Sequence, residues 1–554
     1  FLFEKINDYT ELLLPDDLTS NRSIVNDVVE GISAEDCAEV EIVGWLYQFY
    51  ISEKKDEVFA SKSKVKKEDI PAATQLFTPR WIVEYMVQNT LGKLWLQNRP
   101  QSKLRDFMSY YIESPSTDAE DYLLVSSPED LTLLDQACGS GHILVYGFEL
   151  LSKIYEEEGY NPSEIPSLII INNLFGFEID ERAAQLAGMA ILMKARSYHR
   201  RFFRKGDVPE PQILCYQDLK LSEDEIMNLF EKLNQNPSNE LIHDLGNMRQ
   251  ATNFGSLIVP HSSISEIQKS LEATLKLKKS SDAFIQYQAD QLNNALGQLE
   301  PLARKYHCVV NNPPYMGGGN ANKDLSDFLK TNYPDSKADL MACFMETGLA
   351  VLHPKGFLGM INQHSWMFLS SYEKLRAKLI ENIFFNNLLH LGPRTFPEIG
   401  GEVVQNASFT FWNNKAEEQG AYIRLVDYDK SDLKRTKTLE AIQKPDCGWF
   451  YLANQKDFLK IPGNPFGYWL SKNVHWIFKS SDEISSIVTA GIGMNTGNND
   501  LFVREWAEVP FKSINSKWYP YSKGGQSRKW FGNRNLVLNW ESDGQLIKSK
   551  RFGN

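Results

Sequence analysis

Apolar positions recur at two different spacings along the chain, and each spacing predicts a different kind of element. Through residues 1–70 they recur every three or four positions, which predicts a helical N-terminal region. From residue 131 onwards, short apolar runs that end in Asp, Glu or Asn alternate with amphipathic stretches of helical period. Strands that alternate with helices form a mainly parallel, doubly wound sheet with ligands at the carboxyl ends of its strands. The pattern therefore predicts the α/β class.

The same pattern divides the chain into regions. Residues 71–415 carry the alternation and are expected to form one domain, in which the composition of residues 220–305 predicts a helical insertion. Beyond residue 415 the pattern becomes β-like and irregular, so we expect a connector at residues 416–485 and the start of another domain at 486–554. The chain does not begin with Met and stops soon after an aromatic, basic segment begins, so we expect it to come from a longer polypeptide.

Composition argues against membrane and metal-stabilised classes of protein. Hydrophobic residues make up 42% of the 554 positions and charged residues 23%, as in globular domains. No apolar run approaches the roughly 20 residues that cross a bilayer, so we expect no membrane partner. The six cysteines form no CxxC pair and no HExxH sequence occurs, so we expect neither disulfides nor a metal. A cytoplasmic location fits these features.

The net charge of −12 is unfavourable for a protein that binds nucleic acid, because phosphates attract Lys and Arg. The basic residues are nevertheless concentrated near the C-terminus, where nine follow Phe511 against only Glu541 and Asp543. The candidates for DNA contact are Lys523, Arg528, Lys529 and Arg534. Arg can hydrogen-bond to base edges and Lys can hold phosphates, whereas the aromatic rings among them are equally well explained by a folded core.

A glycine-rich turn follows the first predicted strand of the α/β region. The strand ends at Asp135, and Gly139-Ser140-Gly141 leads directly into a helix. Small residues let the backbone approach a ligand, and the amides at a helix N-terminus favour a carboxylate such as that of S-adenosylmethionine. A tight structural turn is the alternative. The candidate cofactor-binding residues here are Asp135, Ala137, Cys138, Gly139, Ser140 and Gly141.

Three further elements are candidates for the same cofactor site. Glu178 ends the second strand, where an acid can accept hydrogen bonds from both ribose hydroxyls. Asp218 follows the third strand and can accept from an adenine amino group, although a capping role explains it nearly as well. Phe77-Thr78-Pro79 precedes an apolar helix and is a candidate cover for the methionine end of the cofactor. By itself this element is also an ordinary helix start.

The sequence Asn312-Pro313-Pro314-Tyr315 follows an apolar strand and carries the most specific chemistry. Two prolines remove two backbone donors and stiffen the turn, which leaves carbonyl acceptors such as that of Pro313. With the side-chain oxygen of Asn312, these acceptors can hold both hydrogens of a planar amino group. Tyr315 offers a ring on which the base can stack. The alternative is a rigid loop with an incidental aromatic residue.

Three of these motifs, in this order along the chain, resemble the gamma-class N6-adenine DNA methyltransferases: Phe77–Pro79, Asp135–Gly141 and Asn312–Tyr315. The resemblance covers roughly residues 70–415. The resemblance implies a Rossmann-like class I methyltransferase fold, S-adenosylmethionine as cofactor, double-stranded DNA as partner and flipping of the target adenine into the Asn-Pro-Pro-Tyr pocket. It also suggests that Phe396 stacks on the other face of the adenine, for which a core phenylalanine is the alternative. Gln136 departs from the family, which usually has Pro there, and the insertion before Asn312 is unusually long.

Longer stretches resemble the PglX family of bacteriophage-exclusion (BREX) methyltransferases. They are Ala73–Val87, Asp135–His142 and Asn311–Gly319. This resemblance implies nucleoid-associated marking of host DNA, phage defence, and as partners other phage-exclusion proteins and a phage-encoded inhibitor. Residues 491–502 resemble the opening of a target-recognition domain. Three other functions are considered. One is a combined restriction-modification enzyme, for which no convincing nuclease motif is found, and another is an N-methyltransferase of RNA or protein glutamine. The third is a non-catalytic scaffold that binds DNA or partner proteins, against which the intact cofactor and adenine motifs argue.

Overall fold

The computed structural model describes ten segments of the chain, and every structural statement refers to these. They are residues 15–33, 42–61, 63–76, 78–113, 122–206, 208–277, 282–396, 404–482, 484–489 and 494–549. The chain divides into two compact units, Phe1–Lys479 and Ser480–Asn554, and each is described by itself.

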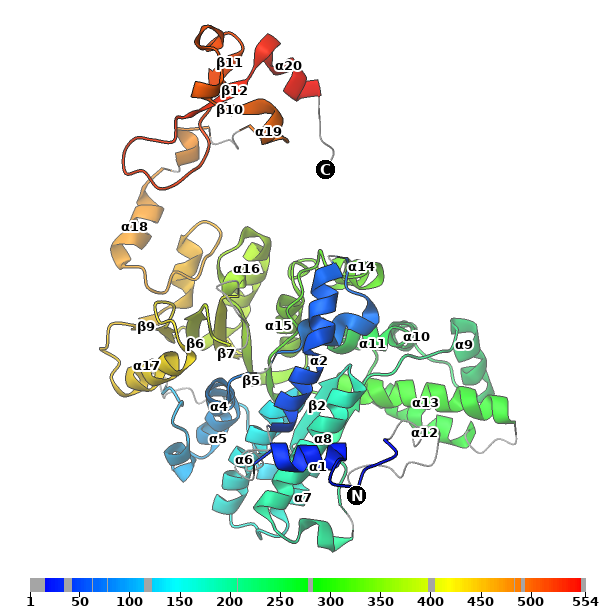
Figure 1. The fold of residues 1–554 in the computed structure, drawn as a ribbon. Coiled ribbons are helices and arrows are strands. Elements are labelled where there is room, and N and C mark those ends of the chain that lie inside the picture. Colours follow the sequence, from blue (N-terminus) through cyan, green and yellow to red (C-terminus); the bar gives the residue numbers. More distant parts are fainter. Residues whose placement is uncertain are drawn as a thin grey trace. The chain divides into compact units, whose positions relative to one another are not determined.

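A nine-stranded sheet organises the first unit (Figure 1). Its order is β3-β2-β1-β4-β5-β7-β6-β8-β9. The strands β1 to β6 and β8 include five parallel neighbour pairs, while β7 lies antiparallel between β5 and β6, and β9 is antiparallel to β8. The expected Rossmann-like, mainly parallel α/β fold is therefore confirmed. The bounds are β1 Leu133–Asp135, β2 Leu174–Glu178, β3 Gln212–Cys215, β4 Tyr306–Asn311, β5 Leu352–Gln363, β6 Phe384–Gly392, β7 Asn406–Trp412, β8 Gly420–Arg424 and β9 Phe450–Ala453.

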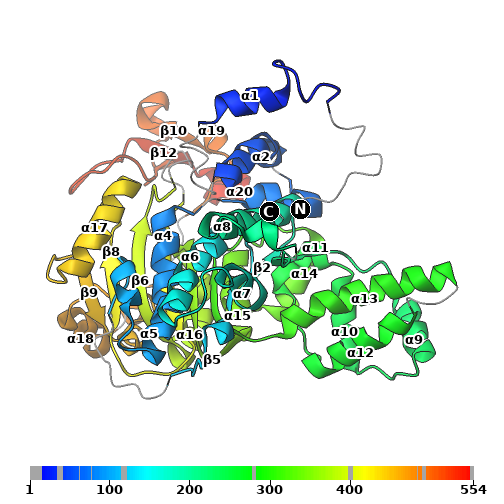
Figure 2. The same ribbon diagram turned by 90° about the horizontal axis from the view of Figure 1, so that it is seen from below.

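The sheet separates two hydrophobic cores, because successive side chains of a strand point to opposite faces. Leu133 and Leu134 are neighbours in β1, yet they belong to different clusters of buried side chains. Helices accordingly cover both faces, as the doubly wound pattern predicts (Figure 2). On one core pack α4 (Arg80–Val87), α5 (Lys93–Asn98), α6 (His142–Glu157), α7 (Ile165–Asn172) and α8 (Glu181–Tyr198).

The other core is covered by α14 (Lys323–Asn332), α15 (Leu340–Ala350), α16 (Glu373–Asn382) and the insertion. The residues expected to form the insertion hold five α-helices, and all of these except α11 project from one side of the sheet in both views (Figures 1 and 2). They are α9 (Glu223–Lys232), α10 (Asn239–Met248), α11 (Ala251–Phe254), α12 (Ile264–Leu277) and α13 (Ala283–Ala303). The Leu219 amide donates to the Met248 carbonyl (2.9 Å), which ties this insertion to the end of β3.

The N-terminal region contains α1 (Ile24–Gly31), α2 (Ile42–Ser61) and α3 (Ile70–Thr74). Residues 416–485, for which we expected a connector, supply β8 and β9 to the main sheet, with α17 (Ser431–Gln443) between them, followed by α18 (Lys472–Ser480). In the second unit, β10 (Val503–Glu505), β12 (Leu536–Asn539) and β11 (Trp518–Pro520) form an antiparallel sheet with α19 (Asn499–Phe502) and α20 (Glu541–Ser549). None of the described helices is long and apolar enough to cross a bilayer.

Candidate functional site

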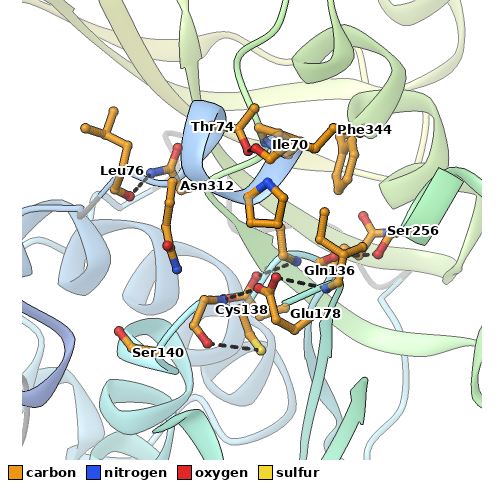
Figure 3. Close-up of a pocket in the computed structure, with 18 of the residues that line it drawn as sticks. Ile70, Thr74, Leu76, Gln136, Cys138, Ser140, Glu178, Ser256, Asn312 and Phe344 are labelled. Atoms are coloured by element: carbon orange, nitrogen blue, oxygen red, sulfur yellow. Dashed lines mark hydrogen bonds between the residues drawn. The ribbon is translucent and has the colours of Figure 1, made fainter. Parts of the chain in front are cut away.

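A cavity lies at the carboxyl ends of β1, β2 and β4, where an α/β sheet is expected to bind its ligand. It encloses about 1080 Å³ of empty space, part of which is open to solvent. Nine of the predicted site residues line it: Thr78, Asp135, Ala137, Cys138, Gly139, Ser140, Glu178, Asn312 and Pro314. Residues more than 200 positions apart in the sequence therefore meet around one space (Figure 3).

The glycine-rich turn needs glycine at two positions. Gly139 and Gly141 have φ of +53° and +84°, in the left-handed region that disfavours other residues. A Cβ on Gly141 would also lie 3.0 Å from the Cα of Ala187 in α8. Gly141 immediately precedes α6, so the unpaired amides of that helix begin at the edge of the cavity.

Two buried carboxyl groups accept hydrogen bonds from the backbone amides of this turn. Asp135 accepts from the Ala137 amide (3.1 Å), and Glu178 Oε2 accepts from the Gly139 amide (2.8 Å). Glu178 Oε1 also accepts from its own neighbours Ile179 (2.8 Å) and Asp180 (3.0 Å). Burial raises the pKa of Asp135 to about 8 and also raises the pKa of Glu178.

Since a carboxylate offers about four acceptor positions, Glu178 keeps about one for a ligand in this arrangement. We expected it to accept from two ribose hydroxyls. Asp180, the next acid along the chain, caps α8 by accepting from the Arg182 amide (3.0 Å).

Asn312 presents an acceptor to the cavity. Its Nδ2 donates to the Leu76 carbonyl (3.0 Å), which fixes the plane of the side-chain amide (Figure 3). Its Oδ1 is buried and has no hydrogen-bond partner among the described residues. Because a buried polar atom without a partner is costly, this oxygen is suited to accept a hydrogen from a ligand.

The other residues of this motif lie differently. Pro314 lines the cavity, whereas Pro313 and Tyr315 are not among its lining residues. The Tyr315 hydroxyl donates to the Ile361 carbonyl at the end of β5 (2.8 Å), and its ring packs against both cores. Phe396 is 3% exposed within the core that contains α6, so the structure supports the core alternative for this residue.

Asp218 is also absent from the cavity lining. It pairs with Lys67 and accepts from the Thr252 amide (2.9 Å), so its contacts tie the N-terminal region to the insertion. Phe77 lies outside the described residues, and Pro79 caps α4 instead of occupying its first turn. The basic candidates Lys523, Arg528, Lys529 and Arg534 are exposed in the second unit, where the Arg534 guanidinium lies 4.5 Å from the Phe531 ring centroid.

Sequence reasoning missed the part of the wall that comes from the insertion. The residues concerned are Asn253, Phe254, Gly255, Ser256 and Leu257. Ser256 donates to the carbonyl of Gln136, and the side chain of Gln136 in turn accepts from Asn311 (3.1 Å). Gln136, which departs from the gamma-class pattern, thus connects the glycine-rich turn to β4. No local pattern marks these contacts, because each joins segments more than 100 residues apart.

Comparison with known proteins identifies the relatives of this chain. It is 42% identical, over 99% of its length, to the adenine-specific methyltransferase BrxX of Escherichia coli O9:H4 (strain HS). It is 37% identical, again over 99% of its length, to the adenine-specific methyltransferase PglX of Lacticaseibacillus casei (strain Zhang). The resemblance to the PglX methyltransferases is therefore confirmed. The chain spans 48% of each of these two relatives.

Two further similarities accompany these relatives. Residues 172–396, which include Asn312–Tyr315, match the Eco57I restriction-modification methylase family. Among solved structures, the chain is similar to the ATP-dependent Type ISP restriction-modification enzyme LlaBIII bound to DNA, with 14% identity and a TM-score of 0.44. That alignment covers 80% of this chain and 25% of the enzyme.

Proposed function

We propose that this chain transfers a methyl group from S-adenosylmethionine to N6 of an adenine that has been flipped out of double-stranded DNA. The observation that carries the proposal is the single cavity that joins the Gly139–Gly141 turn to the Oδ1 of Asn312. The similarity to adenine-specific methyltransferases over 99% of the chain supports the same chemistry.

The residues around the cavity fit this cofactor. The amides at the start of α6 favour its carboxylate, and the Glu178 carboxylate has room for a ribose hydroxyl. Gln75 Oε1 lines the same cavity and is buried without a partner among the described residues, which leaves an acceptor for the ammonium group. When bound there, S-adenosylmethionine supplies an electrophilic methyl group.

The Asn-Pro-Pro-Tyr turn prepares the nucleophile. Asn312 Oδ1 and a backbone carbonyl of the turn accept the two hydrogens of the adenine amino group, which draws its nitrogen out of conjugation with the ring. The nitrogen lone pair would then point at the methyl group of the donor. The new N–C bond would replace the S–C bond of the sulfonium, and the nitrogen would lose one proton. Catalysis in this arrangement comes from positioning and from hydrogen bonds placed in advance. Because the target nitrogen is inside the duplex, the base must leave the stack to reach the cavity.

The resemblance to bacteriophage-exclusion methyltransferases extends the proposal to a biological role. The modified adenines would mark host DNA, and other phage-exclusion proteins and a phage-encoded inhibitor are the partners that this role implies. Sequencing that detects methylated adenine in cells with and without the gene tests it. A genome whose methylation pattern is the same in both strains would contradict it.

A separate experiment tests which class of molecule receives the methyl group. The chain is incubated with labelled S-adenosylmethionine and with unmethylated double-stranded DNA, ribosomal RNA or a glutamine-containing protein. We expect label in DNA alone, recovered as N6-methyl-2′-deoxyadenosine after digestion to nucleosides. Label in RNA or protein but not in DNA would favour the alternative substrate class, and label on cytosine would contradict the assigned base.

A further inference from the structure

The Asn-Pro-Pro-Tyr turn cannot hold itself in place, because Pro313 and Pro314 have no amide hydrogen. Its anchors must therefore come from other parts of the chain. Asn312 is held through Leu76 and Tyr315 through Ile361. The next residue, Met316, supplies the first backbone amide after the prolines that hydrogen-bonds to a side chain, and it donates to Asp339 Oδ1 (3.1 Å).

Asp339 belongs to a segment that is hydrogen-bonded to the residues directly after the turn. The Leu340 amide donates to the Met316 carbonyl (3.2 Å), and the Gly318 amide donates to the Ala338 carbonyl (2.9 Å). Gly317 and Asp339 form an isolated antiparallel bridge. The short segments 316–318 and 338–340 are thus paired like two strands, with the Asp339 side chain adding one bond across them.

The glycine at position 318 makes this close approach possible. A Cβ at Gly318 would lie 2.4 Å from the Lys337 carbonyl oxygen, a backbone atom that cannot move aside alone. At the next position, Gly319, a Cβ would meet nothing within 4 Å. The two neighbouring glycines therefore differ in whether the pairing depends on them.

Asp339 also caps α15, since the same Oδ1 accepts from the Met341 amide (3.1 Å). The first turns of that helix bring Leu340 and Phe344 into the cavity lining. Asp339 is 7% exposed, and burial raises its pKa to about 6. A single buried carboxyl group thus bonds both to the residue that follows the turn and to a helix that lines the cavity.

We propose that Asp339 is a positioning residue, which holds the Asn312–Tyr315 turn in register with the cavity by accepting from Met316. The inference rests on the proposed function, because the register matters for transfer to an amino group. A displacement of the turn by about 1 Å is sufficient for about a 100-fold loss of rate. Cofactor affinity depends mainly on the glycine-rich turn and is expected to change little.

Two pairs of variants separate this role from simple helix capping. Asp339→Ser keeps a good helix cap but is too short to reach Met316, whereas Asp339→Asn keeps an acceptor for both amides. Gly318→Ala breaks the pairing from the other side, and Gly319→Ala is its matched control in open space. In Asp339→Ser and Gly318→Ala we expect faster amide exchange at residues 315–318 and a kcat for DNA methylation at least about tenfold lower.

The controls and the cofactor measurement complete the test. Asp339→Asn and Gly319→Ala should keep kcat within about twofold, and all four variants should bind S-adenosylhomocysteine with affinities within about threefold of the wild type, corresponding to under 1 kcal/mol. A wild-type kcat in both Asp339→Ser and Gly318→Ala would overturn the inference, as would equal losses in Gly319→Ala. If the wild-type chain itself failed to methylate DNA, the proposed function would fail. The amide-exchange measurement would still test whether Asp339 holds the Asn312–Tyr315 turn in place.

Discussion

Two loops at the carboxyl edge of one sheet differ in the hydrogen-bonding groups that they leave for a ligand. The turn at residues 135–141 is rich in backbone donors, and buried carboxyl groups of Asp135 and Glu178 hold it from behind. The turn at residues 312–315 has lost two donors to proline and is held by groups outside it. The first therefore leaves the amides at the start of α6 for an anionic ligand, and the second offers oxygens that suit an amine. The two loops thus differ in the backbone donors and acceptors that they leave for the two proposed ligands.

The largest effect on cofactor affinity is expected at Glu178. Glu178→Ala removes the acceptor of the Gly139 amide and leaves a hole beside the cofactor cavity. We expect the affinity for S-adenosylhomocysteine, measured by calorimetry, to fall by about 30-fold or more, or about 2 kcal/mol. Glu181→Ala, an exposed acid in the adjoining helix, is the matched control and should bind normally. Equal affinities in the two variants would remove Glu178 from the site.

A second effect concerns the protonation of Asp135, which differs between the folded and unfolded chain. Its folded pKa is about 8 against an ordinary value of 3.8, so between these pH values the folded state binds more protons. Stability from this group is therefore present at low pH and is lost as pH rises towards 8, by at most about 1.4 kcal/mol per pH unit. Asp135→Asn should flatten the dependence of the unfolding free energy on pH between 4 and 8. An unchanged slope in denaturant titrations would contradict the assignment.

The smallest effect isolates packing from backbone strain at the glycine-rich turn. Gly141→Ala and Gly159→Ala both place a side chain at positive φ, +84° and +83°, but only Gly141 faces Ala187 at 3.0 Å. Both should lose about 1 kcal/mol of stability from the left-handed backbone, and Gly141→Ala should lose about 1 kcal/mol more from overpacking. Thermal unfolding measures the difference. Equal losses would show that the approach of α8 to the turn is not restrictive.

Sequence reasoning predicts the position of a residue where chemistry and local pattern coincide. Asp135, Gly139, Glu178 and Asn312 follow strands of the predicted parallel sheet, and the topology brings strand ends to one edge. It did not find Ser256 or Asp339, because their partners lie 120 and 23 residues away and no periodicity marks them. It gave Asp218 a ligand role where the fold supplies Lys67 and Thr252 instead.

Phe396 illustrates a different limit of the sequence. Its hydrophobicity fits both a stacking surface and a core position, and only its 3% exposure separates the two. The second unit shows the same ambiguity in reverse, since the exposed Trp530 and Phe531 accompany Arg528 and Lys529. The sequence around an aromatic residue does not show whether its ring lies in a core or at the surface.

The central claim is that Asn312 supplies the acceptor that prepares the amino group, independently of cofactor binding. The most direct measurement compares Asn312→Ala with the exposed control Asn332→Ala, in both methyl transfer to DNA and affinity for S-adenosylhomocysteine. The account predicts a transfer rate at least about 100-fold lower in Asn312→Ala alone, with cofactor affinity within about threefold in both variants. Full methylation activity in a folded Asn312→Ala protein would contradict it.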